Sequence, residues 1–157
     1  MHKPTRRILI ALGLAVAVVA RADAPPAPAP VPSMEDGQVV VFKDVKWSPL
    51  KIPDGAPIQP GIMVSRIAAD AQTGASLAYA KYPPGYVFPP HSHSFAEYTV
   101  SISGTTQFTM NGKTTTLTAG SYVVIPAKTV HSVTCVAGAE CVTLIRRAGP
   151  TDYQWVK

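Results

Sequence analysis

The sequence has little histidine, cysteine or charge, and it lacks a long apolar segment. Its 157 residues include four histidines, two cysteines and 15% charged residues. The apolar run at 8–20 has thirteen residues, which is too short to span a bilayer comfortably. No later segment resembles a transmembrane helix, and no helical period of useful length is visible. These absences argue against a membrane-spanning domain and against a helical fold.

A basic stripe interleaved with aromatic residues is also lacking. The formal net charge of +5 invites a nucleic-acid interpretation, but four basic residues and one acidic residue lie within residues 1–24. Without that segment the net charge falls from +5 to +2. The basicity therefore belongs mostly to the N-terminus, and no nucleic-acid partner is expected.

Residues 1–24 are expected to form an export signal peptide. Basic residues precede the apolar run, and Ala22-Asp23-Ala24 offers a small-x-small cleavage site. Sec export is the default, while the pair Arg6-Arg7 leaves twin-arginine export open. The alternative is an uncleaved membrane anchor. A cleaved protein would be periplasmic or secreted and would have no membrane attachment.

Beyond residue 24 the chain is predicted to contain a spacer and one domain. Residues 25–38 are rich in Pro and Ala, which is typical of an extended linker without a core. Residues 39–157 contain short β-branched and aromatic segments between Pro and Gly turns, including the hairpin signal Asn111-Gly112. An all-β antiparallel barrel or sandwich is expected. The expected strands are 39–42, 62–68, 76–82, 97–103, 105–110, 113–118, 122–125, 131–136 and 141–147.

Three of the four histidines fall into one pattern with a glutamate. The pattern reads Gly85-x5-His91-x-His93-x3-Glu97-x6-Gly104, and the third imidazole comes from His131, eleven residues after Gly120. Three imidazoles and a carboxylate are a transition-metal ligand set that leaves open coordination positions. They suit one divalent Fe, Mn, Ni, Zn or Cu ion and argue against Ca and Mg. His91, His93 and Glu97 have equal parity, so a continuous strand would present them on one face.

At these residues the sequence resembles the cupin superfamily. The first cupin motif, G-x5-H-x-H-x3-E-x6-G, is matched throughout. The second, G-x5-P-x-G-x2-H-x3-N, is matched at Gly120, Pro126 and His131, while Lys128 and Cys135 stand where Gly and Asn are usual. The resemblance implies an exported, bacterial-type, single-domain cupin. Its fold would be a small antiparallel β-barrel or double-stranded jelly roll. Its metal ligands would be His91, His93, Glu97 and His131.

Two interpretations of the cysteines remain open. Cys135 and Cys141 lie across the turn-like segment Ala137-Gly138-Ala139, so in an oxidising compartment a hairpin disulfide is expected. Alternatively, Cys135 shares a strand face with His131, and its thiol borders or binds the metal.

Strand parity also gives candidates for the walls of a pocket. Lys128 precedes His131 in its loop and would either hold an anionic substrate or be solvated. The other candidates are Tyr86, Phe95, Thr99, Ser101, Gln107, Val133 and Cys135. On the opposite face, Tyr98, Val100 and Ile102 must be covered by N-terminal strands or by a second subunit, so a homodimer is a hypothesis.

The favoured function is an exported metal-dependent enzyme that acts on a small organic molecule. The resemblance implies dioxygenase, decarboxylase, isomerase or lyase chemistry without choosing among them. The alternative is a non-catalytic cupin module that binds a metal or a small ligand. No catalytic residue is assigned, because no second carboxylate lies beside the ligand pattern.

Overall fold

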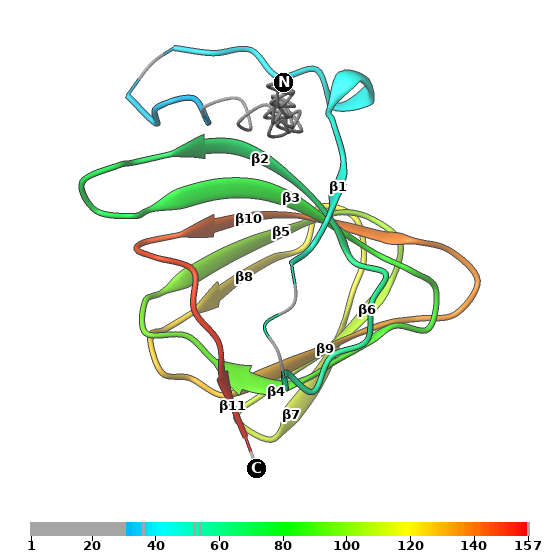
Figure 1. Ribbon diagram of the computed structural model, residues 1–157. Helices are drawn as coiled ribbons and strands as arrows, with labels where there is room; N and C mark the ends of the chain where they lie inside the picture. The colour runs from blue at the N-terminus through cyan, green and yellow to red at the C-terminus, as the bar shows by residue number, and fades with distance from the viewer. Residues whose placement is uncertain (1–30, 36, 52, 54, 157) are drawn as a thin grey trace, which may run out of the picture.

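Two antiparallel sheets face each other in the part of the chain that a computed structural model describes, residues 31–35, 37–51, 53 and 55–156 (Figure 1). The first sheet has the order β1-β2-β3-β10-β5-β8 and the second β11-β4-β9-β6-β7. The strands are β1 Ser48–Pro49, β2 Met63–Ala69, β3 Ser76–Tyr82, β4 Val87–Ser92, β5 Glu97–Ser103, β6 Thr106–Met110, β7 Lys113–Leu117, β8 Tyr122–Ile125, β9 His131–Cys135, β10 Cys141–Arg147 and β11 Gln154–Trp155. This is the predicted jelly-roll architecture.

Helical structure in the described residues is limited to one 3-10 turn, η1 (Phe42–Asp44). No helix there is long and apolar enough to cross a membrane. The predicted signal peptide, 1–24, lies outside the described residues, as do residues 25–30 and 36 of the predicted linker. The end of that linker runs beside the edge of β2, where Ala69 N–H donates to Pro32 O at 2.9 Å.

Every strand that the sequence predicts from residue 62 onward is present within one residue of its expected bounds. β3, β5, β8 and β10 coincide with their predicted ranges, but β4 and β11 were not predicted. β4 contains Pro89-Pro90, and its ladder with β9 shifts register between Phe88 and His91. Because proline has no N–H to donate to the ladder, it is tolerated within a sheet at such irregularities. These two prolines are therefore the reason why the strand that carries His91 was not predicted.

The expected strand at 39–42 is wrong. These residues are exposed, Val39 at 92%, and they lead into η1 instead of pairing. To join the first sheet, residues 39–42 would have to pair with the edge of β2. That edge already pairs with β1 and lies beside residues 32–34. β1 was not among the expected strands.

A disulfide between Cys135 and Cys141 joins the two sheets. Both residues are fully buried and their Cα atoms are 5.7 Å apart, which confirms the predicted pairing and excludes a free Cys135 thiol at the metal site. The expected hairpin is wrong, because β9 and β10 belong to different sheets. A Cβ at Gly104 would come within 3.0 Å of the Cys141 sulfur and 2.4 Å of Glu140 O, so only glycine fits beside this bridge.

Candidate metal centre

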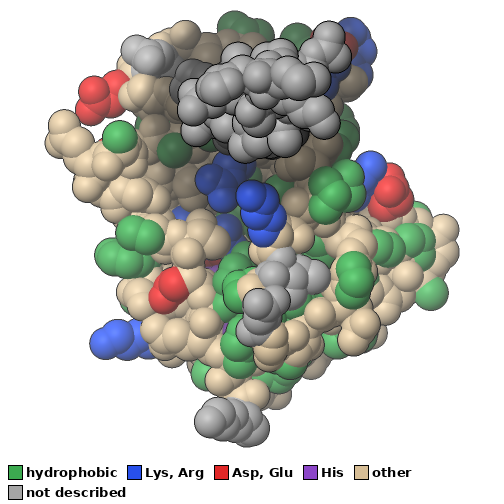
Figure 2. Space-filling model, viewed as in Figure 1, with side chains coloured by type: hydrophobic (Ala, Val, Ile, Leu, Met, Phe, Trp, Pro, Cys, Tyr) green, Lys and Arg blue, Asp and Glu red, His purple; other side chains and the backbone are tan. Residues whose placement is uncertain are grey.

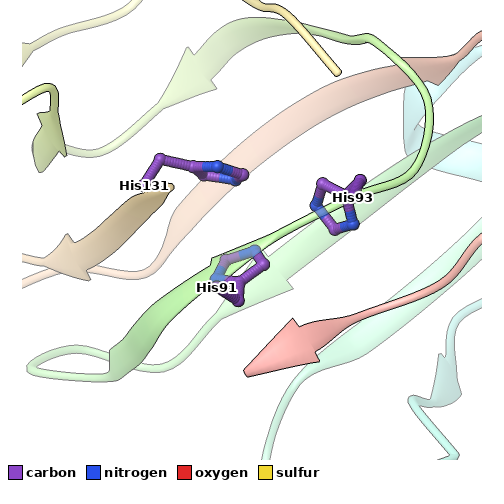
Figure 3. Close-up of side chains that lie close together, drawn as sticks. All are labelled: His91, His93 and His131. Atoms are coloured by element: carbon purple, nitrogen blue, oxygen red, sulfur yellow. The ribbon is translucent and has the colours of Figure 1, made fainter. Parts of the chain in front are cut away.

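The three histidines of the pattern lie together between the two sheets. His91 is in β4, His93 directly follows that strand, and His131 begins β9, opposite His91 in the ladder. One nitrogen of each ring lies within 4.8 Å of the others, and each residue is 3% exposed. Figure 3 shows the rings turned toward a common centre from β4, its following loop and β9. The structure thus brings these three predicted ligands together.

Each ring is oriented by a backbone carbonyl. His91 Nδ1 lies 2.7 Å from Pro89 O, His131 Nδ1 lies 3.0 Å from Thr129 O, and His93 Nδ1 contacts Asp152 O. Because a carbonyl only accepts, each Nδ1 donates its proton and Nε2 keeps its lone pair. Metal-ligating histidines are held in this way, with the second ring nitrogen tied to the protein. Buried His93 Nε2 has no hydrogen-bond partner among the described residues.

The surroundings of the cluster favour the neutral imidazole. Burial lowers the pKa of His91 to about 3, and the nearby His131 adds to that effect. Burial also lowers the pKa of His131. Neutral rings are the form that binds a metal, so the site is prepared for one without losing protons at pH 7.

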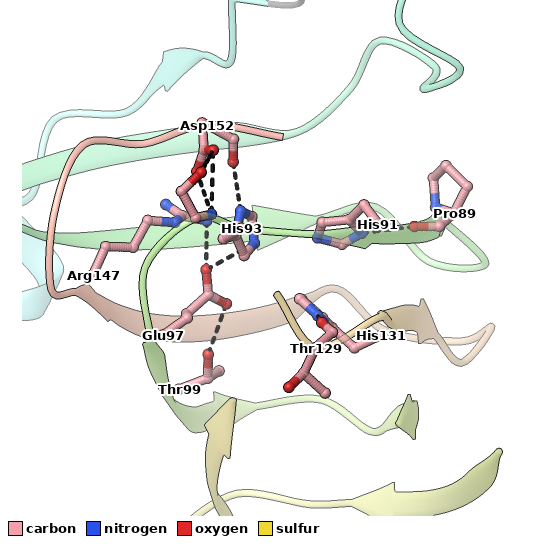
Figure 4. Close-up of polar contacts among 10 residues, drawn as sticks. Pro89, His91, His93, Glu97, Thr99, Thr129, His131, Arg147 and Asp152 are labelled. Atoms are coloured by element: carbon pink, nitrogen blue, oxygen red, sulfur yellow. Dashed lines mark hydrogen bonds and ion pairs between the residues drawn. The ribbon is translucent and has the colours of Figure 1, made fainter. Parts of the chain in front are cut away.

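Glu97 lies beside the cluster and approaches it from the other sheet. The expectation that one strand carries Glu97 together with the two histidines is wrong, because β4 ends at Ser92 and Glu97 begins β5. Glu97 Oε2 is 3.3 Å from His93 Nε2 and 2.7 Å from Arg147 Nη2. Its Oε1 accepts a hydrogen bond from Thr99 Oγ1 at 3.2 Å (Figure 4).

Arg147 is a site residue that the sequence analysis missed. It ends β10 directly opposite Glu97 in the ladder, and the two side chains are 13% and 7% exposed. Burial acts to lower the pKa of Arg147, but Glu97, Tyr153 and Tyr82 together raise it above its usual value. The signal in the sequence was the alternation along β10: Ile145, two residues earlier, points into the core, so Arg147 lies on the same inward face. A charge on the inner face of a strand needs a partner.

The C-terminal segment forms one side of the centre. The Asp152 carboxylate accepts the Ser94 backbone N–H at 3.0 Å and the Ser94 hydroxyl at 2.6 Å. β11 then pairs with β4, with Trp155 opposite His91. The Tyr153 ring stacks on Trp155 and lies 5.3 Å from the ring of His93. These contacts fix the loop that carries His93, and none of the three C-terminal residues was predicted.

A cavity of about 370 Å³ opens beside the histidines. Its walls are mostly aliphatic and aromatic, and its polar side chains include His91, His131, Glu97, Arg147, Arg66 and Tyr153. Figure 2 shows Lys and Arg side chains gathered in the middle of this face, next to a small area of histidine. The volume is at the lower end of ligand pockets, which suits a small organic molecule.

Of the eight predicted pocket residues, Val133 lines this cavity and the other seven do not. Gln107 is exposed because β6 has the opposite parity, with Thr106 and Phe108 pointing inward. Tyr86 is buried in the core, and its hydroxyl donates to Gln59 O. Cys135 is occupied by the disulfide.

The remaining predicted pocket residues also lie elsewhere. Phe95 is 42% exposed and packs on Gly149, while Thr99 and Ser101 sit on β5 away from the cavity wall. Lys128 is exposed, with φ at +63° in the left-handed region where the cupin pattern has Gly. Its backbone N–H donates to His93 O at 2.7 Å. Its contribution to the site is therefore made by the backbone.

The comparisons with known proteins agree with this geometry. Residues 78–145 match the family model described as "Cupin domain". The polyketide cyclase RemF from Streptomyces resistomycificus has a TM-score of 0.63 at 19% identity, over 78% of this chain and 87% of that one. A cupin 2 conserved barrel domain protein from Rhodopseudomonas palustris has a TM-score of 0.61 at 20% identity, over 73% and 79%. KdgF from Halomonas sp. has 0.56 at 19% identity, over 74% and 96%. The comparison with curated proteins returned no match.

Proposed function

The chain belongs to the cupin superfamily, and on that premise we propose that it is a metal-dependent enzyme acting on a small organic molecule. One divalent transition ion would be held by His91, His93 and His131, with Glu97 as the fourth donor. Iron, manganese, nickel, zinc or copper suits this donor set. Arg147 would share the Glu97 carboxylate with the ion.

The observation that carries the proposal is the common orientation of the three rings. All three Nδ1 atoms are engaged by backbone carbonyls, and one nitrogen of each ring lies within 4.8 Å of the others. His93 Nε2 is buried without a hydrogen-bond partner in the described part of the chain, which is costly in a low-dielectric interior. A cation removes that cost.

Catalysis is favoured over passive binding because the centre borders a cavity. A bound ion would supply Lewis acidity or, for a redox-active metal, oxygen chemistry. The side chains around the cavity would supply the other contributions to catalysis. The apolar walls exclude water, and the Tyr153 hydroxyl is a donor that burial keeps protonated by raising its pKa. The polyketide cyclase RemF shares this fold, which supports the barrel as a container for small-molecule chemistry.

Metal content tests the proposal most directly. The purified untagged protein is expected to bind one equivalent of zinc or cobalt by elemental analysis and titration, and His131→Ala is expected to lose it. Gln107→Ala is the matched control, because Gln107 is exposed and outside the cavity. Full stoichiometry in the His131 variant would exclude this ligand set. Saturated tetrahedral cobalt spectra without a response to any small molecule would favour the non-catalytic binding module.

We further propose that the protein is exported and cleaved after Ala24. The disulfide supports this, because such bonds persist in oxidising compartments. Mass spectrometry of the native protein is expected to give a mature N-terminus at Pro25 in the periplasmic or culture fraction. A membrane-bound protein that starts at Met1 would show that the segment is an anchor.

A further inference from the structure

The cavity carries one unpaired positive charge that the metal centre does not use. On β2, Val64 and Arg66 occupy alternate positions and line the cavity, and Ala68 and Ala69 continue this wall beyond the register shift that follows Arg66. Arg66 is exposed, as expected for a residue at the mouth of a cavity.

The charges around the cavity do not cancel. Glu97 is the only carboxylate on its wall in the described part of the chain, and it is paired with Arg147 at 2.7 Å. Arg66 forms no ion pair with any described residue. Asp70, which follows β2, already accepts the backbone N–H groups of Gln72 and Thr73. The wall therefore has a net positive charge before any cation is added.

The rest of the wall fixes the kind of molecule that would fit. Most of the remaining lining is apolar, with Ile62, Ala80 and Phe88 among its members. An elongated ligand with a neutral apolar body and one anionic end would match this arrangement. A guanidinium binds a carboxylate through paired N–H donors in a fixed fork.

We propose that the substrate is a small monocarboxylate whose carboxylate binds Arg66 at the mouth of the cavity, while its apolar body extends toward the histidines. This rests on the proposed function, because it specifies the substrate class of the same site. Arg66 is then a specificity-determining residue. A positively charged mouth also steers anions into the cavity.

Matched ligands test the inference. Isovalerate with isovaleramide and benzoate with benzamide would be titrated into zinc-loaded and chelator-treated protein by calorimetry. Arg66→Gln is expected to weaken carboxylate binding about tenfold or more in both states and to leave amide binding unchanged. Arg146→Gln is the control, since that guanidinium lies outside the cavity, 5.6 Å from the Tyr98 ring. A bound metal contributes equally to the wild type and to R66Q, so their ratio isolates Arg66.

Equal carboxylate affinity in R66Q and R146Q would overturn the inference, and so would the absence of carboxylate binding to the wild type. Zinc stoichiometry measured on the same preparations separates this result from the proposed function. Arg66-dependent carboxylate binding without zinc would refute only the metal site. Zinc binding without that dependence would refute only the substrate class.

Discussion

At the scale of single residues, the pair formed by Glu97 and Arg147 contains two buried charges of opposite sign. Removing one partner of such a pair leaves the other charge buried and unpaired. Arg147→Met is therefore expected to cost about 3–5 kcal/mol of unfolding free energy in urea titrations. The double variant with Glu97→Gln is expected to recover part of that loss, because it leaves no buried charge. Lys43→Met removes an exposed pair and is the control. Additive losses in the double variant would contradict the coupling.

The buried imidazole of His91 makes the stability of the metal-free protein depend on pH. Its pKa is about 3 in the folded protein, whereas an unfolded histidine takes up its proton near pH 6.5. Between these values protonation favours the unfolded chain, so stability is fully present above about pH 6.5 and falls progressively toward pH 3.

Thermal unfolding of chelator-treated protein across this pH range measures the effect. Since the neutral amide in His91→Gln does not titrate, its midpoint is expected to fall less steeply with acid than that of the wild type. The difference between the curves isolates His91 from other acid-titrating groups. Parallel curves would show that His91 is not desolvated as described.

At the scale of elements, the sequence predicts the ladders well and their relative placement poorly. The alternation in Glu97–Ser103 and the Asn111-Gly112 turn report local geometry, so β5 and the β6–β7 hairpin can be derived from them. The break after Ser92 and the position of Arg147 depend on which sheet each strand joins. That choice is made by contacts far apart in the chain, which strand parity does not encode. The ligand motif was predictable because spacing alone carries it.

The C-terminal element is expected to tune the centre through Asp152. Asp152→Ala removes the carboxylate that holds Ser94, and with it the support of the carbonyl that orients His93. Loss of such outer-shell partners weakens metal affinity about 10- to 100-fold. Asp70→Ala is the control, because Asp70 holds a turn in the same way but outside the cavity. Zinc titration with a competing chelator measures both, and equal affinities would contradict a positioning role for Asp152.

At the scale of the whole molecule, the first sheet has an apolar outer face that extends to its edge. Tyr122 and Val124 on β8 are 57% and 46% exposed, and β8 is the last strand of that sheet. The neighbouring Tyr98 and Val100 on β5 are partly exposed. Contiguous apolar surface on an edge strand favours association.

A homodimer through this face is therefore expected in solution. Val124→Glu places a charge at the centre of the patch and is expected to give a monomer by size-exclusion chromatography with light scattering, because an unpaired charge in an apolar interface is not solvated. Val87→Glu changes a valine of 58% exposure on the second sheet and is expected to leave the dimer intact. If the wild type is monomeric at all concentrations, or if only the Val87 variant dissociates, the interface lies elsewhere. Since the cavity is built by one chain, zinc stoichiometry per chain is expected to be equal in monomer and dimer.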